Sequence, residues 1–138
     1  VIRGIEMIIH NQIRQEILDV LANGGLKKIK FFHNGKTVFK DLGQELPAIS
    51  VFIDETESNA FTVCEDEWIG DLQIAIYLPL HSNESELDEI AEQISFIMKD
   101  CDLETVSDCR LSRYSYDYDA NESAWITATL HYSINYFS

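Results

Sequence analysis

The chain has 138 residues, of which 46% are apolar, 24 are acidic and 10 are basic, so its formal net charge is −14 at pH 7. A chain of this length buries a core as one domain without disulfide or metal staples. The acidic balance argues against direct nucleic-acid binding, because contacts to phosphates depend on Lys and Arg. The charge either serves solubility alone or keeps DNA at a distance, and composition does not decide between the two.

The cysteines and the apolar runs bear on two further classes. The chain has an odd number of cysteines and no C-x-x-C pair: Cys64, Cys101 and Cys109. This usage is typical of free thiols in a reducing compartment. No apolar run approaches the roughly 20 residues needed to span a membrane, so we expect no membrane partner. Met7 resembles a natural start, and we expect residues 1–6 to be upstream sequence and residues 7–138 to form a single domain.

The first half of the chain predicts one helix followed by strands. Apolar residues recur at helical spacing at Ile9, Ile13, Ile17, Leu18 and Leu21. Asn-Gly-Gly at residues 23–25 is a typical helix stop. Asn-Gly at residues 34–35 separates two short apolar runs, at 28–32 and 36–39, and predicts a β-hairpin. Residues 48–53 predict a third strand.

The second half predicts an arm, another strand and a second helix. Residues 54–67 are acidic and polar and form either a long loop or an extended β-arm. Residues 68–78 alternate as a strand until Pro79. Ser85-Glu-Leu-Asp88 matches a capping box that opens a helix. The apolar stripe of this helix comprises Leu87, Ile90, Ala91, Ile94, Ile97 and Met98.

The chain closes with a strand at residues 111–119 and a long strand at residues 125–137. The element order α-β-β-β-β-α-β-β predicts an α+β fold: a two-layer domain with a mixed, mostly antiparallel β-sheet and two helices packed on one face. One alternating set of the closing strand is apolar: Ile126, Ala128, Leu130, Tyr132, Ile134 and Tyr136. The other is polar: Thr127, Thr129, His131, Ser133 and Asn135. The polar set holds no nucleophile–base pair, metal cluster or phosphate loop, which favours contact over chemistry.

No motif elsewhere predicts a chemical site. Residues 117–128 begin like a calcium loop, but Glu122 stands where Gly is needed and Ala128 where a bidentate Glu is needed. A turn is favoured there, with adventitious cation binding as the alternative. The four histidines lack ligand spacing: His10, His33, His81 and His131. We therefore expect no enzyme activity, no cofactor and no metal site. The carboxylates are so abundant that any two could be drawn as an acid–base pair, so without their geometry they do not indicate a catalytic site.

Two clusters have two interpretations each. Tyr114, Tyr116 and Tyr118 share one face of their strand, either for cross-strand packing or for an interface. Glu84 and Glu86 lie where a helix dipole favours acids, or they form a salt bridge with a basic residue of a neighbouring subunit.

A set of individually weak motifs covers nearly the whole chain. In the first half these are Ile13-Arg14, Ile17-Leu18-Asp19, Phe31-Phe32, Gly35, Val38-Phe39, Pro47-Ala48 and Val51. In the second half these are Trp68, Leu72, Ile74, Leu78-Pro79, Ser85-Glu-Leu-Asp88, Tyr116-Asp-Tyr118, Trp125, Leu130, Tyr132, Ile134 and Tyr136. In this order and spacing, the chain resembles the tail-terminator proteins of lambda-like long-tailed phages, the minor tail protein U family.

The resemblance implies a structural protein that forms a homo-hexameric ring on the tail tube, or a monomer in dilute solution. Such a ring stops polymerisation of the tail-tube protein and presents a surface to the head-completion protein, and DNA passes through it without specific binding. The location implied is the phage virion, with the bacterial host cytoplasm during assembly. Residues 54–67 and 110–113 depart from the family pattern, which leaves the tail partner open.

Charge complementarity directs the choice of contact residues, because an Arg near a neighbour's carboxylate matters in a chain with few basic residues. The subunit-contact candidates are Arg14, Glu84, Glu86, Asp88, Arg110 and Arg113. The candidates for contact with the tube or head are Asp54, Glu55 and Glu57. Two rival hypotheses are a small acidic protein-binding adaptor unrelated to phage assembly, and an enzyme that uses a carboxylate pair in a deep pocket.

Overall fold

The computed structural model describes residues 3–35, 47–60, 66–79, 83–100, 102–118 and 125–137. Within these residues the helices are α1 (Arg3–Ala22) and α3 (Glu84–Asp100). The strands are β1 (Phe31–Asn34), β2 (Ala48–Ala60), β3 (Asp66–Pro79), β4 (Asp108–Tyr118) and β5 (Trp125–Phe137). They form one sheet in the order β1-β2-β3-β5-β4, in which β1 and β2 are parallel and the other pairs are antiparallel. The expected mixed, mostly antiparallel α+β fold is confirmed.

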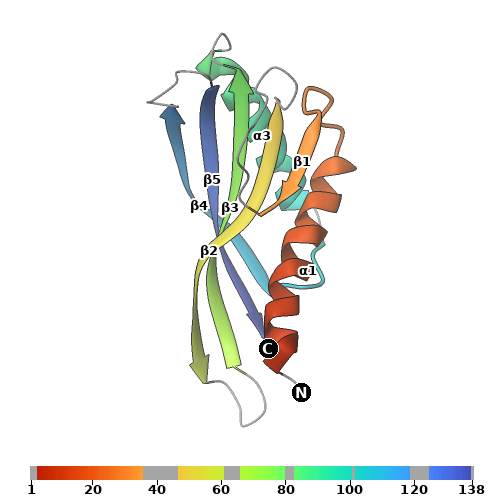
Figure 1. Ribbon diagram of the computed structural model, residues 1–138, viewed down its shortest axis with the longest axis vertical. Helices are drawn as coiled ribbons and strands as arrows, with labels where there is room; N and C mark the ends of the chain where they lie inside the picture. Colours follow the sequence, from red (N-terminus) through yellow and green to blue (C-terminus); the bar gives the residue numbers. More distant parts are fainter. Residues whose placement is uncertain are drawn as a thin grey trace.

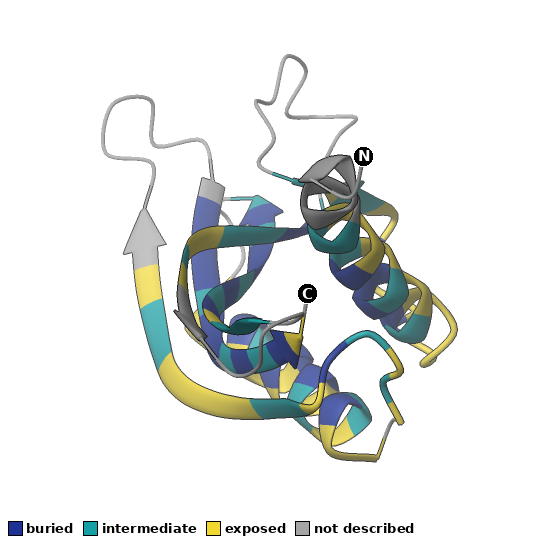
Figure 2. Ribbon diagram, turned by 90° about the horizontal axis from the view of Figure 1, so that it is seen from below, coloured by how far each residue is buried: buried dark blue, intermediate teal, exposed yellow. Residues whose placement is uncertain are grey.

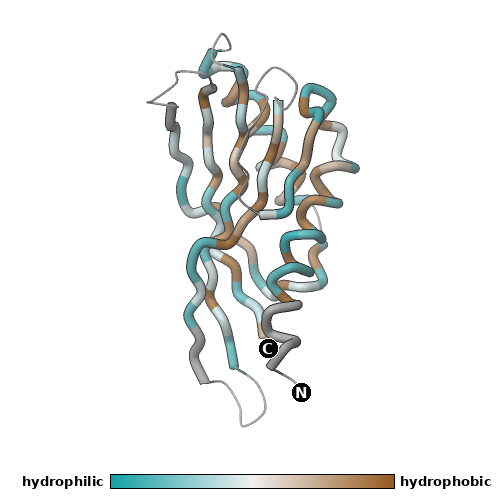
Figure 3. Tube along the Cα trace, viewed as in Figure 1, coloured by the Kyte–Doolittle hydropathy of each residue, from teal (hydrophilic) through white to brown (hydrophobic). Residues whose placement is uncertain are grey.

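Both helices pack on the same face of the twisted sheet, called here the covered face (Figure 1). Alternation directs one set of side chains from each strand toward the helices. On β3 and β5, Ile74, Leu130 and Ile134 are at most 1% exposed, and from the helices Ile17 and Ile94 are fully buried against them. Figure 3 shows hydrophobic residues concentrated on the central strands, whereas β2 becomes hydrophilic past its midpoint. The opposite side of the sheet is called the open face.

The helix ends show one correction. Helix α1 ends as expected, at a turn in which Gly25 has φ +86. Helix α3 does not begin with a capping box at Ser85. Its N-cap is Asn83, whose Oδ1 accepts the backbone N–H of Glu86 at 3.0 Å. Asp88 is thereby left free of a capping role and contacts strand β4 instead. Neither described helix is long and apolar enough to cross a membrane.

Two contacts join α1 to distant parts of the chain. The carboxylate of Glu16 accepts the backbone N–H groups of Glu104 and Thr105, at 2.8 and 3.1 Å, and the hydroxyl of Thr105. Near the other end of the helix, Nε2 of His10 lies 2.5 Å from the hydroxyl of Tyr136, whose ring stacks on Trp68. These contacts hold α1 against the sheet at two levels.

Some of the predicted strands lie within the described residues, and others lie outside them. The extended β-arm is confirmed, since β2 continues to Ala60 and β3 begins at Asp66. Strand β1 pairs in parallel with β2. The other half of the expected hairpin, residues 36–39, lies outside the described residues, as do the turn at 119–124, Cys64 and Cys101. Of the cysteines, Cys109 is described, and it is half-buried.

Two β-bulges bend the sheet near its middle. On β2, Asp54 and Glu55 together oppose the single residue Asp71 of β3. On β4, Ser112 is the extra residue between the pairs that Leu111 and Arg113 make with β5. Bulges increase the local twist and turn side chains to the other face. Figure 2 shows the consequence for β4, which curves along the margin of the sheet with most of its described residues exposed.

Candidate assembly surface

The acidic start of α3 contacts the edge strand through Asp88. Its Oδ1 accepts the hydroxyl of Tyr114 at 3.2 Å and also the hydroxyl of Tyr116. The two rings meet edge to face with centroids 5.0 Å apart. The hydrogen bond to Asp88 raises the pKa of Tyr116, and burial raises the pKa of Tyr114, so both hydroxyls stay protonated as donors. Packing is therefore seen for these two tyrosines, while Tyr116 remains 44% exposed.

The bulge at Ser112 decides which residues of β4 lie on which face. Leu111 pairs with Tyr132 on the covered side, and Arg113 pairs with His131 on the open face. Regular alternation from Leu111 would have placed Arg113 under the helices. Arg110 also lies on the open face, where its Nε is 2.9 Å from Oδ2 of Asp108 and its side chain is 79% exposed. Such an exposed pair contributes little to stability, so Arg110 is available for exchange with another partner.

A polar cluster surrounds His131 at the centre of the open face. Its Nε2 lies 3.2 Å from Oγ of Ser115, and its Nδ1 lies 3.3 Å from Nη2 of Arg113 and 3.7 Å from Oδ1 of Asp71. The expectation concerned the polar residues of the closing strand alone, and the residue that approaches His131 here, Ser115, comes from β4. The order Ser–His–Asp resembles a triad, but the carboxylate is beyond hydrogen-bond distance and Arg113 faces the nitrogen it would need. The cluster connects β3, β4 and β5.

The acidic residues of β2 form one wall of a groove on the open face. Asp54, Glu55 and Glu57 are exposed along the bulged part of the strand. The groove has a volume of about 220 Å³ and is lined by Glu55, Glu57, Ile69, Gly70, Asp71, Ser112 and Ser133. Both bulges therefore contribute to it. Within the described residues, no group of three or more His, Cys, Asp or Glu side chains is placed to hold a metal ion.

Arg14 lies apart from the other candidates. Its Nε donates to Oδ1 of Asn34 at 2.6 Å, and Nδ2 of Asn34 donates to Oδ1 of Asn11 at 2.9 Å. This network joins α1 to β1, which is the opposite edge of the sheet from β4. The structure therefore brings Asp88 to the edge strand that carries Arg110 and Arg113, and it does not bring Arg14 there.

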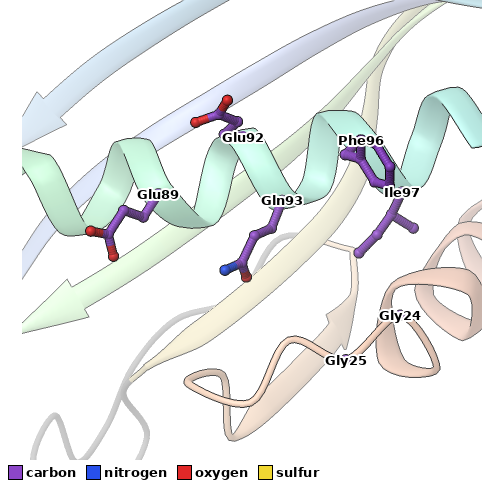
Figure 4. Close-up of a pocket in the computed structure, with 7 residues that line it drawn as sticks. All are labelled: Gly24, Gly25, Glu89, Glu92, Gln93, Phe96 and Ile97. Atoms are coloured by element: carbon purple, nitrogen blue, oxygen red, sulfur yellow. The ribbon is translucent and has the colours of Figure 1, made fainter.

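One exposed aromatic residue was missed from the sequence. Phe96 on α3 is 72% exposed and lines a cavity of about 430 Å³ with Gly24, Gly25, Glu89, Glu92, Gln93 and Ile97 (Figure 4). The sequence held a sign of it, because Phe96 falls outside the apolar stripe of its helix. A single exposed aromatic residue is common on protein surfaces, so the exposure of Phe96 alone does not mark a contact surface.

Comparison with known families decides the family of this chain. The model of the family described as phage minor tail protein U matches residues 8–136. The chain belongs to the phage minor tail protein U family. Its similarity to curated relatives has the same extent. The tail tube terminator protein of Escherichia phage lambda is 28% identical over 130 residues, covering 92% of this chain and 97% of that protein.

A second relative and a solved structure agree with this membership of the minor tail protein U family. The tail tube terminator protein of Escherichia phage N15 is 28% identical over 131 residues, with the same coverage of both chains. Among solved structures, a chain of the virion of a native gene transfer agent particle superposes with a TM-score of 0.59. It covers 91% of this chain and 95% of that chain at 9% identity, a likeness that concerns the fold alone.

Proposed function

We propose that this protein is a structural phage tail protein that terminates the tail tube. It assembles as a homo-hexameric ring on the finished tube, stops addition of tail-tube protein and offers a surface to the head-completion protein. The observation that carries the proposal is the family match over residues 8–136, together with relatives that are named tail tube terminator proteins. The protein then resides in the virion tail, after assembly in the bacterial host cytoplasm.

Two charged surfaces on the β4 side of the domain are the proposed parts of a head-to-tail ring contact. A ring requires two different surfaces on each subunit, one of which meets the other on the next copy. Edge strand β4 presents Arg110 and Arg113, and the exposed side of α3 presents Glu84, Glu86 and Asp88. We propose that these charges lie at the contacts between neighbouring subunits. Arg14 remains a weaker candidate, since its guanidinium already binds Asn34.

The acidic bulged segment of β2 is the proposed contact with the tube or head. Asp54, Glu55 and Glu57 are exposed in the part of β2 that leads into the arm it forms with β3 (Figure 1). Carboxylates in such a position require a partner surface that carries Lys or Arg. The net charge of −14 also lets DNA pass through the ring without binding, because the phosphates meet few cations.

Controlled tube assembly tests the function. Tube protein of the same phage is polymerised with and without this protein, and tube lengths are measured by electron microscopy. We expect tubes of limited length with rings at their ends. The matched control is Glu84→Lys, which keeps the fold because Glu84 is exposed, and which we expect to form no ring. Tubes that grow to the same length with and without the unmodified protein would refute the proposal.

The salt dependence of assembly provides a second test. Copies with a charge of −14 repel one another, and screening shortens the range of that repulsion to about 10 Å at 0.1 M salt. We expect ring formation to increase as salt is raised from low concentration, measured by sedimentation. Rings that loosen steadily over this range would show that close ion pairs outweigh the overall repulsion.

A further inference from the structure

The outer side of α3 carries a preformed cup beside the end of α1. The cup is the cavity of about 430 Å³ that Gly24, Glu92, Phe96 and Ile97 help to line. A Cβ on Gly24 would lie 2.5 Å from Cδ1 of Ile97, so a larger residue there would displace the end of the Ile97 side chain. Figure 4 shows Ile97 directed toward the Gly24–Gly25 turn and Glu92 directed away from it.

The rim of the cup is acidic and its floor is apolar. Lys28 already forms an exposed pair with Glu89 at 3.2 Å. Glu92 and Asp100 are exposed and make no ion pair within the described residues, and Asp100 lines an adjoining hollow with Phe96. A partner that fits therefore carries one apolar side chain between positive charges.

The edge strand of the protein itself has this chemistry. Leu111 is 45% exposed and stands between Arg110 and Arg113 in sequence. The bulge at Ser112 exposes this segment at the margin of the sheet, with the leucine on one face and the arginines on the other. The other basic stretch in the described residues, 27–30, buries its apolar residue, Ile29, which is 7% exposed. The Arg110–Arg113 segment thus combines an exposed apolar side chain with two exposed cations.

We propose that the cup on α3 of one subunit receives Leu111 and its flanking arginines from strand β4 of the next copy. Leu111 packs against Phe96 and Ile97, and the guanidinium groups, which leave the strand on its other face, reach around the strand edge to Glu92 and Asp100. The contact is head-to-tail, because cup and segment are different surfaces of the same chain, and this is the type of contact from which rings are built. The proposal rests on the ring-forming function stated above and specifies the surface by which neighbouring subunits recognise each other.

Mixing two variants tests the head-to-tail contact directly. Phe96→Asp damages the cup and keeps the segment, and Leu111→Asp damages the segment and keeps the cup. Each variant alone is expected to weaken association by at least about tenfold and to sediment as a monomer, as is typical for loss of a central apolar contact. An equimolar mixture retains one intact contact per pair, so it is expected to yield dimers and nothing larger. Rings in the mixture, or rings from either variant alone, would overturn the proposal.

Further variants test separately whether an effect comes from loss of folding, from a change of charge or from loss of ring formation. Phe31→Asp, at an apolar residue of the opposite edge strand β1 that is 39% exposed, is expected to assemble normally, and all variants should keep the far-UV circular dichroism of the parent chain. The charge exchange Glu92→Arg with Arg110→Glu is expected to restore rings that either single change abolishes; no recovery would overturn the pairing. An unmodified protein that stays monomeric at every salt concentration would overturn both this contact and the proposed ring, whereas rings from Phe96→Asp would overturn the contact alone.

Discussion

The covered and open faces of β5 are both closely packed, but by different interactions. On the covered face Leu130 and Ile134 are at most 1% exposed and belong to the hydrophobic core cluster. On the open face Thr127 and His131 are 6% and 7% exposed, and each makes hydrogen bonds to a neighbouring strand. Apolar burial depends on area and tolerates small shifts, whereas hydrogen bonds require one geometry. The covered face therefore stabilises the fold, and the open face determines where charges are presented.

The largest predicted effect comes from the covered face. Leu130→Ala removes a side chain that is 1% exposed and leaves a cavity beneath the helices. We expect a loss of about 3 kcal/mol in the free energy of unfolding, measured by urea denaturation. Its neighbour Thr129→Ala on the open face serves as the control and should change this free energy by less than about 1 kcal/mol. Equal losses at both positions would remove the distinction between the faces.

A smaller effect on the free energy of unfolding is expected at Gly70, beside the bulge in β2. A Cβ on Gly70 would lie 3.2 Å from Cγ2 of Thr56 and 3.3 Å from Cγ1 of Ile134. Gly70→Val adds branched carbons to this contact, so we expect a destabilisation of about 2 kcal/mol from overpacking. The paired substitution Ile134→Val in the same chain should recover part of the loss. A Gly70→Val protein as stable as the unmodified one would show that the residues around Gly70 shift at little cost in free energy.

The hydrogen bonds of Glu16, on helix α1, are expected to make the free energy of unfolding depend on pH. Burial opposes the ionised carboxylate, but the hydrogen bonds from Thr105 and Glu104 outweigh it and lower the pKa of Glu16. Its stabilisation is therefore complete above the ordinary pKa of 4.5 and is lost as pH falls through the lower folded-state value. We expect Glu16→Gln to reduce stability by about 1 kcal/mol at pH 7 and to flatten the acid limb of the stability curve. Parallel curves for both proteins would contradict this assignment.

The smallest effect on stability is expected at the exposed cations of β4. Arg110→Ala removes a surface pair with Asp108 and should change the free energy of unfolding by less than about 0.5 kcal/mol. The same change is expected to weaken ring assembly, measured by sedimentation. A monomer that becomes clearly unstable would place Arg110 among the residues that hold the fold.

Periodicity predicted the covered face because burial imposes a period of two on strands and 3.6 on helices. It did not predict the bulges, since one extra residue changes the face of every residue beyond it without altering composition. For this reason the sequence showed that Tyr114 and Tyr116 share one face of their strand, but it did not show whether that is the covered or the open face of the sheet. The approach of Arg113 to His131 was missed as well. The start of α3 was misplaced because Asn83 and Ser85 are both good caps, and only the backbone geometry decides between them.

The ring contacts between α1 and the sheet provide an intrinsic fluorescence probe. Trp68 lies nearly parallel to Tyr136 with ring centroids 6.4 Å apart, and the ring of His10 meets both edge to face. The chain has two tryptophans, so Trp125→Phe leaves Trp68 as the sole indole emitter. Detachment of α1 from the sheet would then change the fluorescence and the near-UV dichroism of Trp68, while loss of the β4 edge would leave both unchanged. One unlabelled chain can thus report local opening of its first helix in real time, separately from global unfolding.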